Sequence, residues 1–346
     1  MAVETEVRES ARAVHERALI IDALMISYNF EQKYAEQVKD GGISAALMSL
    51  GGSTPVHDGF VTTVKRIDEY LQMIDASDVY VPALSVSDII QAKQAGHVAL
   101  VFSLQTASVI EDDLALLRTL HRLGCRILQP AYNDRNSVGS GAGEERDDGL
   151  SRLGRDVVAE ANRLGVVMDA AHCGTRTTLD TIEASAAPVI ISHAACSTLH
   201  QNARNKNDEV ISALGVNDGV MGITPFPPFI RWNERATLDD YLDHVEHVVE
   251  VAGIDHVGLG LDMNTKYVEE GKLPKPEVLR KYPWIYGTEP DGSPLQRQFA
   301  YPVGLGSHTE CINVTDGLLR RGYSEADVEK VLGGNFLRVF EQVWGG

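Results

Sequence analysis

Eight short apolar segments, separated by helix-like stretches, constrain the fold of this chain more than any other feature. Most are near-continuous hydrophobic runs, as expected of parallel strands that are covered on both faces. Eight strand–helix alternations predict an α/β fold, a closed (β/α)8 barrel of the TIM type. An open doubly wound sheet is the alternative, which is weaker because no GxGxxG motif follows the first segment. The segments are 19–26, 43–50, 98–105, 126–132, 166–171, 188–194, 220–226 and 256–263.

Helical patterns fill the intervals between these segments. The stretches 151–165 and 177–185 follow the fourth and fifth segments and carry apolar residues at helical spacing. The stretch 237–253 opens on a threonine followed by acidic residues, which is typical of a helix N-terminus. The stretch 324–343 begins with a Ser-x-x-Asp capping signal.

The chain is expected to form a single barrel domain over 1–346. A length of 346 residues suits an α/β barrel of about 250 residues with insertions, and no repeat or linker divides it. The longest irregular stretch, about 265–315, is rich in Pro, Gly and Tyr. Because it follows the eighth strand, we expect it to lie over the barrel mouth, as a lid or a partner contact.

Charge and composition exclude several classes of function. The net charge of -18 argues against nucleic acid and against anionic membranes as partners. The N-terminal stretch is charged throughout, and no apolar run approaches about 20 residues, so we expect neither a secretory signal nor a membrane span and place the protein in the cytoplasm. Disulfides and zinc-finger spacings are not indicated by the scattered cysteines Cys125, Cys173, Cys196 and Cys311.

Chemistry in such barrels sits at the C-terminal ends of the strands. His172 and His193 close neighbouring strands, so both are expected at one mouth, in a metal or catalytic role rather than a structural one. Asp262 directly follows a buried strand and must be hydrogen-bonded, paired or metal-bound. Two histidines and a carboxylate suit zinc or a similar divalent ion. The alternative is that Asp262 only accepts backbone N–H groups from the next loop.

Other polar residues near the strand ends are less specific. Arg204 lies in a polar loop beside Lys206, and from this context alone we interpret it as a solvated loop charge. The alternative is a bidentate clamp on a substrate carboxylate. The loop 132–141 either reaches over a substrate or forms a turn. His308 lies in the long late loop, where a single histidine is weak evidence.

Four stretches together resemble the membrane (renal) dipeptidase family of zinc peptidases, which belongs to the amidohydrolase-like, metallo-dependent hydrolase barrels. The resemblance covers nearly the whole chain. It implies that family's barrel, a hydrolase activity and a homodimer. The four stretches are "GLSRLGRDVVAEANRLGVVMDAAHCGTRTTLDTIEAS", "APVIISHAACSTL" with "NARN", "HVGLGLDMN" and "RRGYSEADVEKVLGGNFLRVF".

Several family residues carry over to this sequence. His172 and His193 match two ligands of one zinc ion. Arg204 matches the residue that holds the substrate's terminal carboxylate. Asp262 matches the aspartate that serves the other zinc ion and shuttles a proton. The resemblance therefore implies a small substrate that carries a carboxylate.

The sequence departs from the family pattern at further positions. The family's His-x-Asp pair after the first strand is replaced by Leu24 and Ile26, and its bridging Glu by Gln105. A family histidine after the fourth strand appears as Tyr132. Two dications about 4 Å apart repel by about 16 kcal/mol at an effective dielectric constant of about 20. Asp262 alone offsets this poorly, so we expect one Zn2+ or other divalent ion, or none, instead of a binuclear zinc centre.

The sequence therefore predicts a hydrolase or lyase of dipeptidase ancestry with a reduced metal site and altered chemistry. Asp262 and Tyr132 are the candidate catalytic groups, and His308 or Tyr132 the candidates for a missing ligand. The exchange of charged for apolar residues at the first strand predicts room for an apolar or aromatic group. Two alternatives stay open, an ordinary zinc dipeptidase and a non-catalytic ligand-binding protein. The candidate substrate contacts are Arg204, Gln105 and Asn133.

Overall fold

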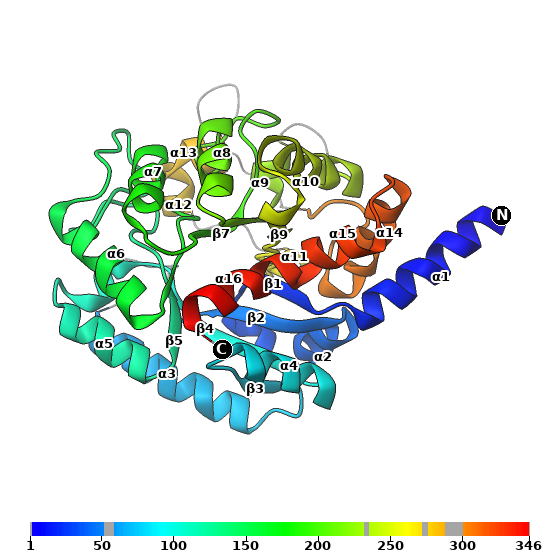
Figure 1. Ribbon diagram of the computed structural model, residues 1–346, viewed down its shortest axis with the longest axis horizontal. Helices are drawn as coiled ribbons and strands as arrows, with labels where there is room; N and C mark the ends of the chain where they lie inside the picture. The colour runs from blue at the N-terminus through cyan, green and yellow to red at the C-terminus, as the bar shows by residue number, and fades with distance from the viewer. Residues whose placement is uncertain (1, 52–58, 232–234, 272–275, 288–299, 346) are drawn as a thin grey trace.

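The computed structural model describes residues 2–51, 59–231, 235–271, 276–287 and 300–345. Within these residues, parallel strands form a ring in the order β6-β5-β4-β2-β1-β9-β8-β7 (Figure 1). A parallel bridge between Asp169 and Ile190 links β6 to β7, so the ring closes into a barrel. The ring strands are β1 (Ile20–Met25), β2 (Ile43–Ser49), β4 (Val98–Leu104), β5 (Cys125–Leu128), β6 (Val167–Met168), β7 (Ile190–Ala194), β8 (Val220–Ile223) and β9 (Val257–Leu259).

Each of the eight predicted segments overlaps one strand of this ring, so the (β/α)8 prediction is confirmed and the open doubly wound sheet is excluded. One further strand, β3 (Tyr80–Pro82), was not predicted. It pairs in parallel with β4 outside the ring, with Tyr80 opposite Val98. Three residues that end in proline carry too little pattern to indicate a strand.

The helices surround the ring (Figure 1). The predicted caps form: the Ser324 side chain accepts the N–H of Asp327, and Thr237 and Asp240 form a capping box. None of the helices in the described ranges is both long and apolar enough to cross a membrane. The helices are α1 (Ala2–Arg17), α2 (Gln32–Asp40), α3 (Phe60–Asp75), α4 (Val86–Ala95), α5 (Leu114–Arg122), α6 (Arg152–Leu164), α7 (Thr175–Ala184), α8 (Asp208–Val216), α9 (Pro227–Ile230), α10 (Leu238–Ala252), α11 (Thr265–Glu269), α12 (Pro276–Lys281), α13 (Pro283–Tyr286), α14 (Ile312–Arg320), α15 (Glu325–Glu329) and α16 (Asn335–Trp344).

The base of the barrel is closed by α16. This helix packs against β1, β6, β8 and β9, which lie on different sides of the ring. Its Phe336 and Phe340 belong to the same buried cluster as the inward-facing strand residues Ile21, Val101 and Val220. Gly333, just before α16, lies against the backbone at the start of β1, so the helix sits at the N-terminal ends of the strands (Figure 1). The opposite end of the barrel is left for chemistry.

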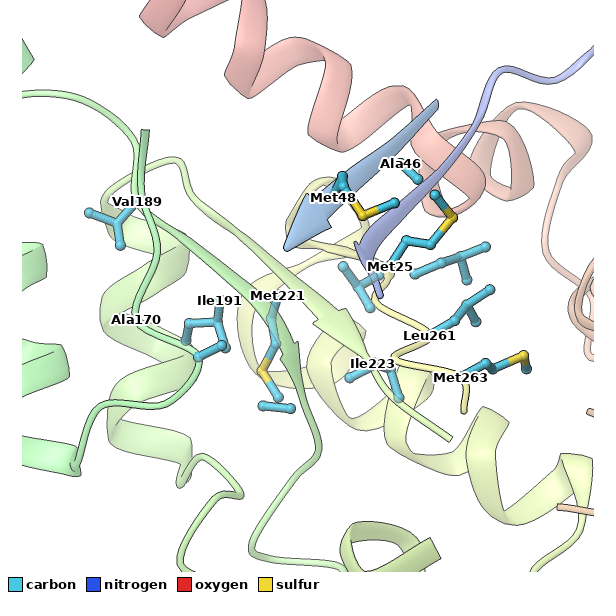
Figure 2. Packing of buried hydrophobic residues seen from close by; sticks show 14 of the residues in the cluster. Met25, Ala46, Met48, Ala170, Val189, Ile191, Met221, Ile223, Leu261 and Met263 are labelled. Atoms are coloured by element: carbon cyan, nitrogen blue, oxygen red, sulfur yellow. The ribbon is translucent and has the colours of Figure 1, made fainter. Parts of the chain in front are cut away.

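A second buried layer lies between the strands and the outer helices. Figure 2 shows part of it, with Met25 of β1 and Met48 of β2 on the same side of the view as Leu261 and Met263, which follow β9. Alternate strand residues enter the two clusters, as the two faces of a sheet require. The register between β1 and β2 shifts between Asp22 and Met25, a bulge at the mouth end of β1.

The irregular stretch about 265–315 contains α11 to α13 and a 3-10 turn at His308–Glu310. Its described parts contact loops at the mouth end of the barrel. The Tyr282 hydroxyl donates to Asp134 after β5, and the carbonyl of Ile285 accepts a hydrogen bond from Asn202 after β7. The lid role stays a prediction, and its residues 272–275 and 288–299 lie outside the described ranges.

Candidate active site

The two histidines expected at one mouth lie in direct contact. His172 follows β6 and His193 lies within β7, and their Nε2 atoms are 2.9 Å apart. Both side chains are buried. Burial lowers the pKa of both rings well below the usual value, and the nearby Arg204 guanidinium lowers it further. Both imidazoles are therefore neutral near pH 7, which is the form that binds a metal or accepts a proton.

Beneath the histidines lies a buried carboxylate, Asp169, that the sequence interpretation missed. Its Oδ1 accepts the backbone N–H groups of Ala171 (3.0 Å) and Ser192 (2.9 Å). Its Oδ2 accepts the Ser192 hydroxyl (2.6 Å) and the Gln129 amide (2.8 Å). Burial raises the pKa of Asp169, while the hydrogen bonds from Ser192 and the nearby Lys206 ammonium oppose that rise. The carboxylate ties β6, β7 and the end of β5 together at the floor of the site.

Tyr132 and Asn133, which follow β5, both contact His172. The Tyr132 ring stacks on the imidazole with centroids 3.7 Å apart. The Asn133 side-chain oxygen lies 2.9 Å from Nδ1 of His172. Burial raises the pKa of Tyr132 far above its usual range, so the phenol keeps its proton. Tyr132 can therefore donate a hydrogen bond at the mouth, while Asn133 holds the back of the ring.

Arg204 is not a solvated loop charge, and that interpretation was wrong. Arg204 is only 3% exposed, because the loop after β7 folds back on itself, with a parallel bridge between Cys196 and Lys206. Its Nε donates to the Ala171 carbonyl at 3.2 Å and its Nη2 to the His193 carbonyl at 3.3 Å, and its guanidinium lies over the Phe229 ring. Within the described ranges, no carboxylate forms an ion pair with it. A buried cation with two long hydrogen bonds and no ion pair within the described ranges can accept an anionic ligand.

Lys206, two residues farther on, is buried as well. Its ammonium donates to the carbonyls of Ala170 (3.0 Å) and Cys173 (2.7 Å), on either side of His172. Burial lowers the pKa of Lys206 to about 8. The sequence interpretation had treated Lys206 as a solvated neighbour of Arg204; it instead fixes the backbone that carries His172.

Asp262 follows β9 in a left-handed conformation with φ 44°. Its own N–H donates to the carbonyl of Leu24 at 3.2 Å, and the Tyr301 hydroxyl donates to its carbonyl at 3.1 Å. In the described part of the chain, nothing donates a hydrogen bond to its carboxylate, which argues against the alternative that backbone N–H groups satisfy it. Burial raises the pKa of Asp262 to about 7, and Arg204 opposes the rise.

A second missed carboxylate, Asp22, lies in β1 and is fully buried. Its Oδ1 accepts the N–H groups of Leu24 (3.1 Å) and Leu261 (2.8 Å), next to Asp262. Its Oδ2 lies 3.2 Å from Nε2 of His308. His308, a candidate for a missing metal ligand, is thus engaged with Asp22 and supports the ends of β1 and β9.

Two of the positions that depart from the family pattern, Leu24 and Ile26, carry hydrocarbon side chains that cannot bind a metal ion. Leu24 is 2% exposed, and Gln105 is also buried at the end of β4. The described residues contain no group of three or more His, Cys, Asp or Glu side chains that could hold a metal ion. The hydrocarbon side chains of Leu24 and Ile26 and the neutral amide of Gln105 do not fit a binuclear zinc centre, because they supply no negative charge to offset the repulsion between two dications. The two Nε2 atoms, 2.9 Å apart, are closer than the roughly 3.3 Å that separates two imidazole nitrogens on one tetrahedral zinc ion, so a single ion on both rings would require a small outward movement of the rings.

Comparison with known proteins gives a consistent result. The sequence model of membrane dipeptidase (peptidase family M19) matches residues 9–279 and 286–344. The chain is similar to an uncharacterized dipeptidase of Schizosaccharomyces pombe, with 34% identity over 58% of this chain and 48% of that protein. It is also similar to dipeptidase tcpJ of Claviceps purpurea, with 30% identity over 83% of this chain and 61% of that protein. The chain thus spans about half to three fifths of the length of these two curated relatives.

A solved structure matches over nearly the full length of both chains. It is the crystal structure of an amidohydrolase from Pseudomonas aeruginosa, with a TM-score of 0.85 and 33% identity. The match covers 97% of this chain and 99% of that chain. Barrel and sequence therefore point to the same group of proteins.

Proposed function

The chain belongs to the membrane dipeptidase family, peptidase family M19, and from this membership we propose an enzyme that acts on a small carboxylate-bearing substrate with at most one divalent metal ion. The observation that carries the proposal is the residue set at the ends of β1 and β4. There, Leu24, Ile26 and Gln105 replace three metal ligands of the family pattern. Arg204 and Asp262, which match the family's substrate-binding and proton-transfer positions, are nevertheless kept.

Substrate binding rests on Arg204. Its buried guanidinium has carbonyl partners but no ion pair with a carboxylate in the described ranges. A substrate carboxylate supplies the missing negative charge and can form a bidentate pair. Asn133 and Gln105 remain candidate polar contacts. Leu24 and Ile26 favour an apolar or aromatic group on the remainder of the substrate.

Proton transfer rests on Asp262 and Tyr132. A carboxyl group whose pKa is raised to about 7 is suited to accept and return a proton near neutral pH. Tyr132, which keeps its proton, can donate a hydrogen bond to a developing negative charge. A single divalent ion on His172 and His193, when bound, supplies Lewis-acid polarisation of a carbonyl or a water. In its absence, acid–base chemistry on a more reactive substrate, such as an elimination or isomerisation, is the proposed reaction class.

An ordinary zinc dipeptidase is the second candidate function. It is favoured by the names of the curated relatives, which are dipeptidases. His172, His193 and Arg204 also match the family positions that serve zinc and substrate. The two candidates differ in metal content and in their rate on simple dipeptides. The homodimer and the cytoplasmic location stay predictions, and analytical ultracentrifugation tests the former.

The test restores the three ligands. Wild type and the variant Leu24→His/Ile26→Asp/Gln105→Glu are purified with zinc, analysed for metal content and assayed on a panel of dipeptides. We expect at most one zinc equivalent and slow hydrolysis for wild type, and a second equivalent with faster hydrolysis for the variant. A matched control, Leu84→His/Ile90→Asp/Gln91→Glu, places the same side chains on exposed positions and adds no such zinc.

Two zinc equivalents and rapid dipeptide hydrolysis in wild type would refute the proposal and establish the second candidate. A restored variant that gains neither zinc nor activity would show that these positions are not the former ligand sites. If the His193→Ala variant turns over every substrate as fast as wild type, this site does not take part in the reaction.

A further inference from the structure

A continuous chain of buried polar groups crosses the floor of the site. It runs from the Asp169 carboxylate through the Ser192 hydroxyl, the two imidazoles and the Asn133 amide. The links are 2.6 Å from Ser192 to Asp169 and 2.7 Å from His193 Nδ1 to Ser192. They continue with 2.9 Å between the two Nε2 atoms and 2.9 Å from His172 Nδ1 to Asn133. Each contact requires one hydrogen, so the positions of the protons depend on one another.

The Asp169 end fixes one direction in this chain. Asp169 receives two backbone N–H groups and the Gln129 amide, and the Lys206 ammonium lies nearby, so its carboxylate is the acceptor. The single Ser192 hydroxyl proton points to Asp169. The Ser192 oxygen must then accept a hydrogen from Nδ1 of His193. The Nε2 atom of His193 consequently carries a lone pair, which points at His172.

The Asn133 end has no such constraint. An asparagine amide presents an oxygen acceptor and an NH2 donor of nearly equal size, and a half-turn exchanges them. In the described part of the chain, the one hydrogen bond of the Asn133 side chain is to His172, so the amide NH2 group is not committed to another acceptor. With the oxygen toward His172, its Nδ1 carries the proton and both Nε2 lone pairs converge. With the NH2 group toward His172, its Nε2 carries the proton and donates to His193.

We propose that Asn133 is a positioning residue whose amide rotates to match the two states of the histidine pair, and that Ser192 on Asp169 holds His193 in one tautomer in both. In the cation-free state, an Nε2–H···Nε2 hydrogen bond joins the rings. In the cation-bound state, both Nε2 lone pairs face the ion. This inference rests on the proposed function, because it concerns a site that holds one ion or none.

The hydrogen bond between the two imidazoles has a consequence for the affinity of the site for a cation. A cation must displace the hydrogen bond between the rings before it binds, so the cation-free state competes with the ion. An acidic residue at position 133 can only accept, and it removes the competing state. Partners of metal-bound histidines change metal affinity by about 10- to 100-fold. We therefore expect Asn133→Asp to bind zinc about tenfold more tightly than wild type.

The experiment reads the tautomers directly. Nitrogen chemical shifts of 15N-histidine-labelled protein, recorded by long-range 1H–15N NMR after chelator treatment and again with zinc, show which ring nitrogen carries the proton. We expect His172 to carry it on Nε2 without zinc and on Nδ1 with one equivalent, and His193 to keep it on Nδ1. His244 is an internal reference, since its Nδ1 accepts the N–H of Cys196 at 3.0 Å.

Three variants sharpen the test. Asn133→Asp is expected to carry the proton of His172 on Nδ1 already without zinc. Ser192→Ala is expected to release His193 into a mixture of tautomers. Asn313→Asp, whose side chain bonds to the Gly304 carbonyl and contacts neither ring, adds the same charge elsewhere and is expected to leave tautomers and zinc affinity unchanged.

A proton on Nδ1 of His172 in the chelator-treated wild type would overturn the proposal. So would zinc saturation without a change at His172, or no zinc binding at millimolar concentration, because the amide would then have no second state to match. These readings need no substrate. A wild type with two zinc equivalents and rapid dipeptide hydrolysis would instead refute the proposed function, while the cation-free tautomers could still be read.

Discussion

The two sides of the barrel mouth differ in kind. At the ends of β6 and β7, buried polar groups are joined in one hydrogen-bonded chain from Asp169 to Asn133. At the ends of β1 and β4, Leu24 and Gln105 fill the same level with hydrocarbon and a neutral amide. The polar side keeps the supporting groups as well as the histidines. The apolar side also contains a buried carboxylate, Asp22, in β1. The two sides of the mouth thus differ in polarity, and the polar side holds the histidine pair together with Arg204.

The largest effect is expected on the apolar side. Leu24→Ala should lower the free energy of unfolding by about 3 kcal/mol, because it leaves a cavity in a closely packed region. Leu84→Ala, at a position that is 49% exposed, should change it by less than about 0.5 kcal/mol. Denaturant titration measures both. A loss below about 1 kcal/mol at Leu24 would mean that this side chain lines open space, and the contrast between the two sides would fail.

The second largest effect is on the pH dependence of stability, and it arises from the carboxylate of Asp262. The pKa of Asp262 is raised to about 7, so folding favours its protonated form. The contribution of the Asp262 carboxyl group to the free energy of unfolding is complete below the pKa of aspartate in the unfolded chain, about 3.9. It is lost as the pH rises through about 7. In metal-free protein, wild type should lose about 2 kcal/mol relative to Asp262→Asn between pH 4 and 7, with allowance for the partly exposed side chain. Parallel stability curves for the two proteins would contradict a raised pKa.

The smallest effect has the opposite sign and lies on the polar side. Arg204→Met should raise the free energy of unfolding by about 1 kcal/mol, because a buried cation without a carboxylate is replaced by an apolar side chain. Arg321→Met is the matched control. Arg321 pairs with Asp239, Asp243 and Glu246, so its loss should destabilise the protein.

Denaturant titration of the ligand-free protein measures both arginine variants. If Arg204→Met destabilises the protein as much as the control does, Arg204 stabilises the fold and is not a site for an anionic ligand.

The barrel could be predicted because its signal is local. Continuous apolar runs mark strands that are buried on both faces, and each of the eight appeared in the ring. The strand β3 could not be predicted, since three residues pair with β4 only through the tertiary fold. The bulge in β1 between Asp22 and Met25 also leaves no sequence signal, because it arises from pairing with β2.

The site could be predicted only in part. His172 and His193 were found because they end neighbouring strands. Asp169 and Asp22 were missed, although the rule applied to Asp262, that an acid within a buried strand must be satisfied, also applies to them. Arg204 was misread because its neighbours are charged, whereas burial of its loop depends on how the chain folds back after β7.

The closure of the barrel base by α16 has a consequence for biosynthesis. Because α16 follows every ring strand along the chain, a growing polypeptide exposes the apolar interior at the strand starts until this helix has left the ribosome. The first strand, β1, must also wait for its neighbour β9. Such long-range pairing slows folding and produces aggregation-prone intermediates. The ring is therefore completed late. A chaperone that shields the open base of the barrel during translation would bind the apolar surface that α16 later covers.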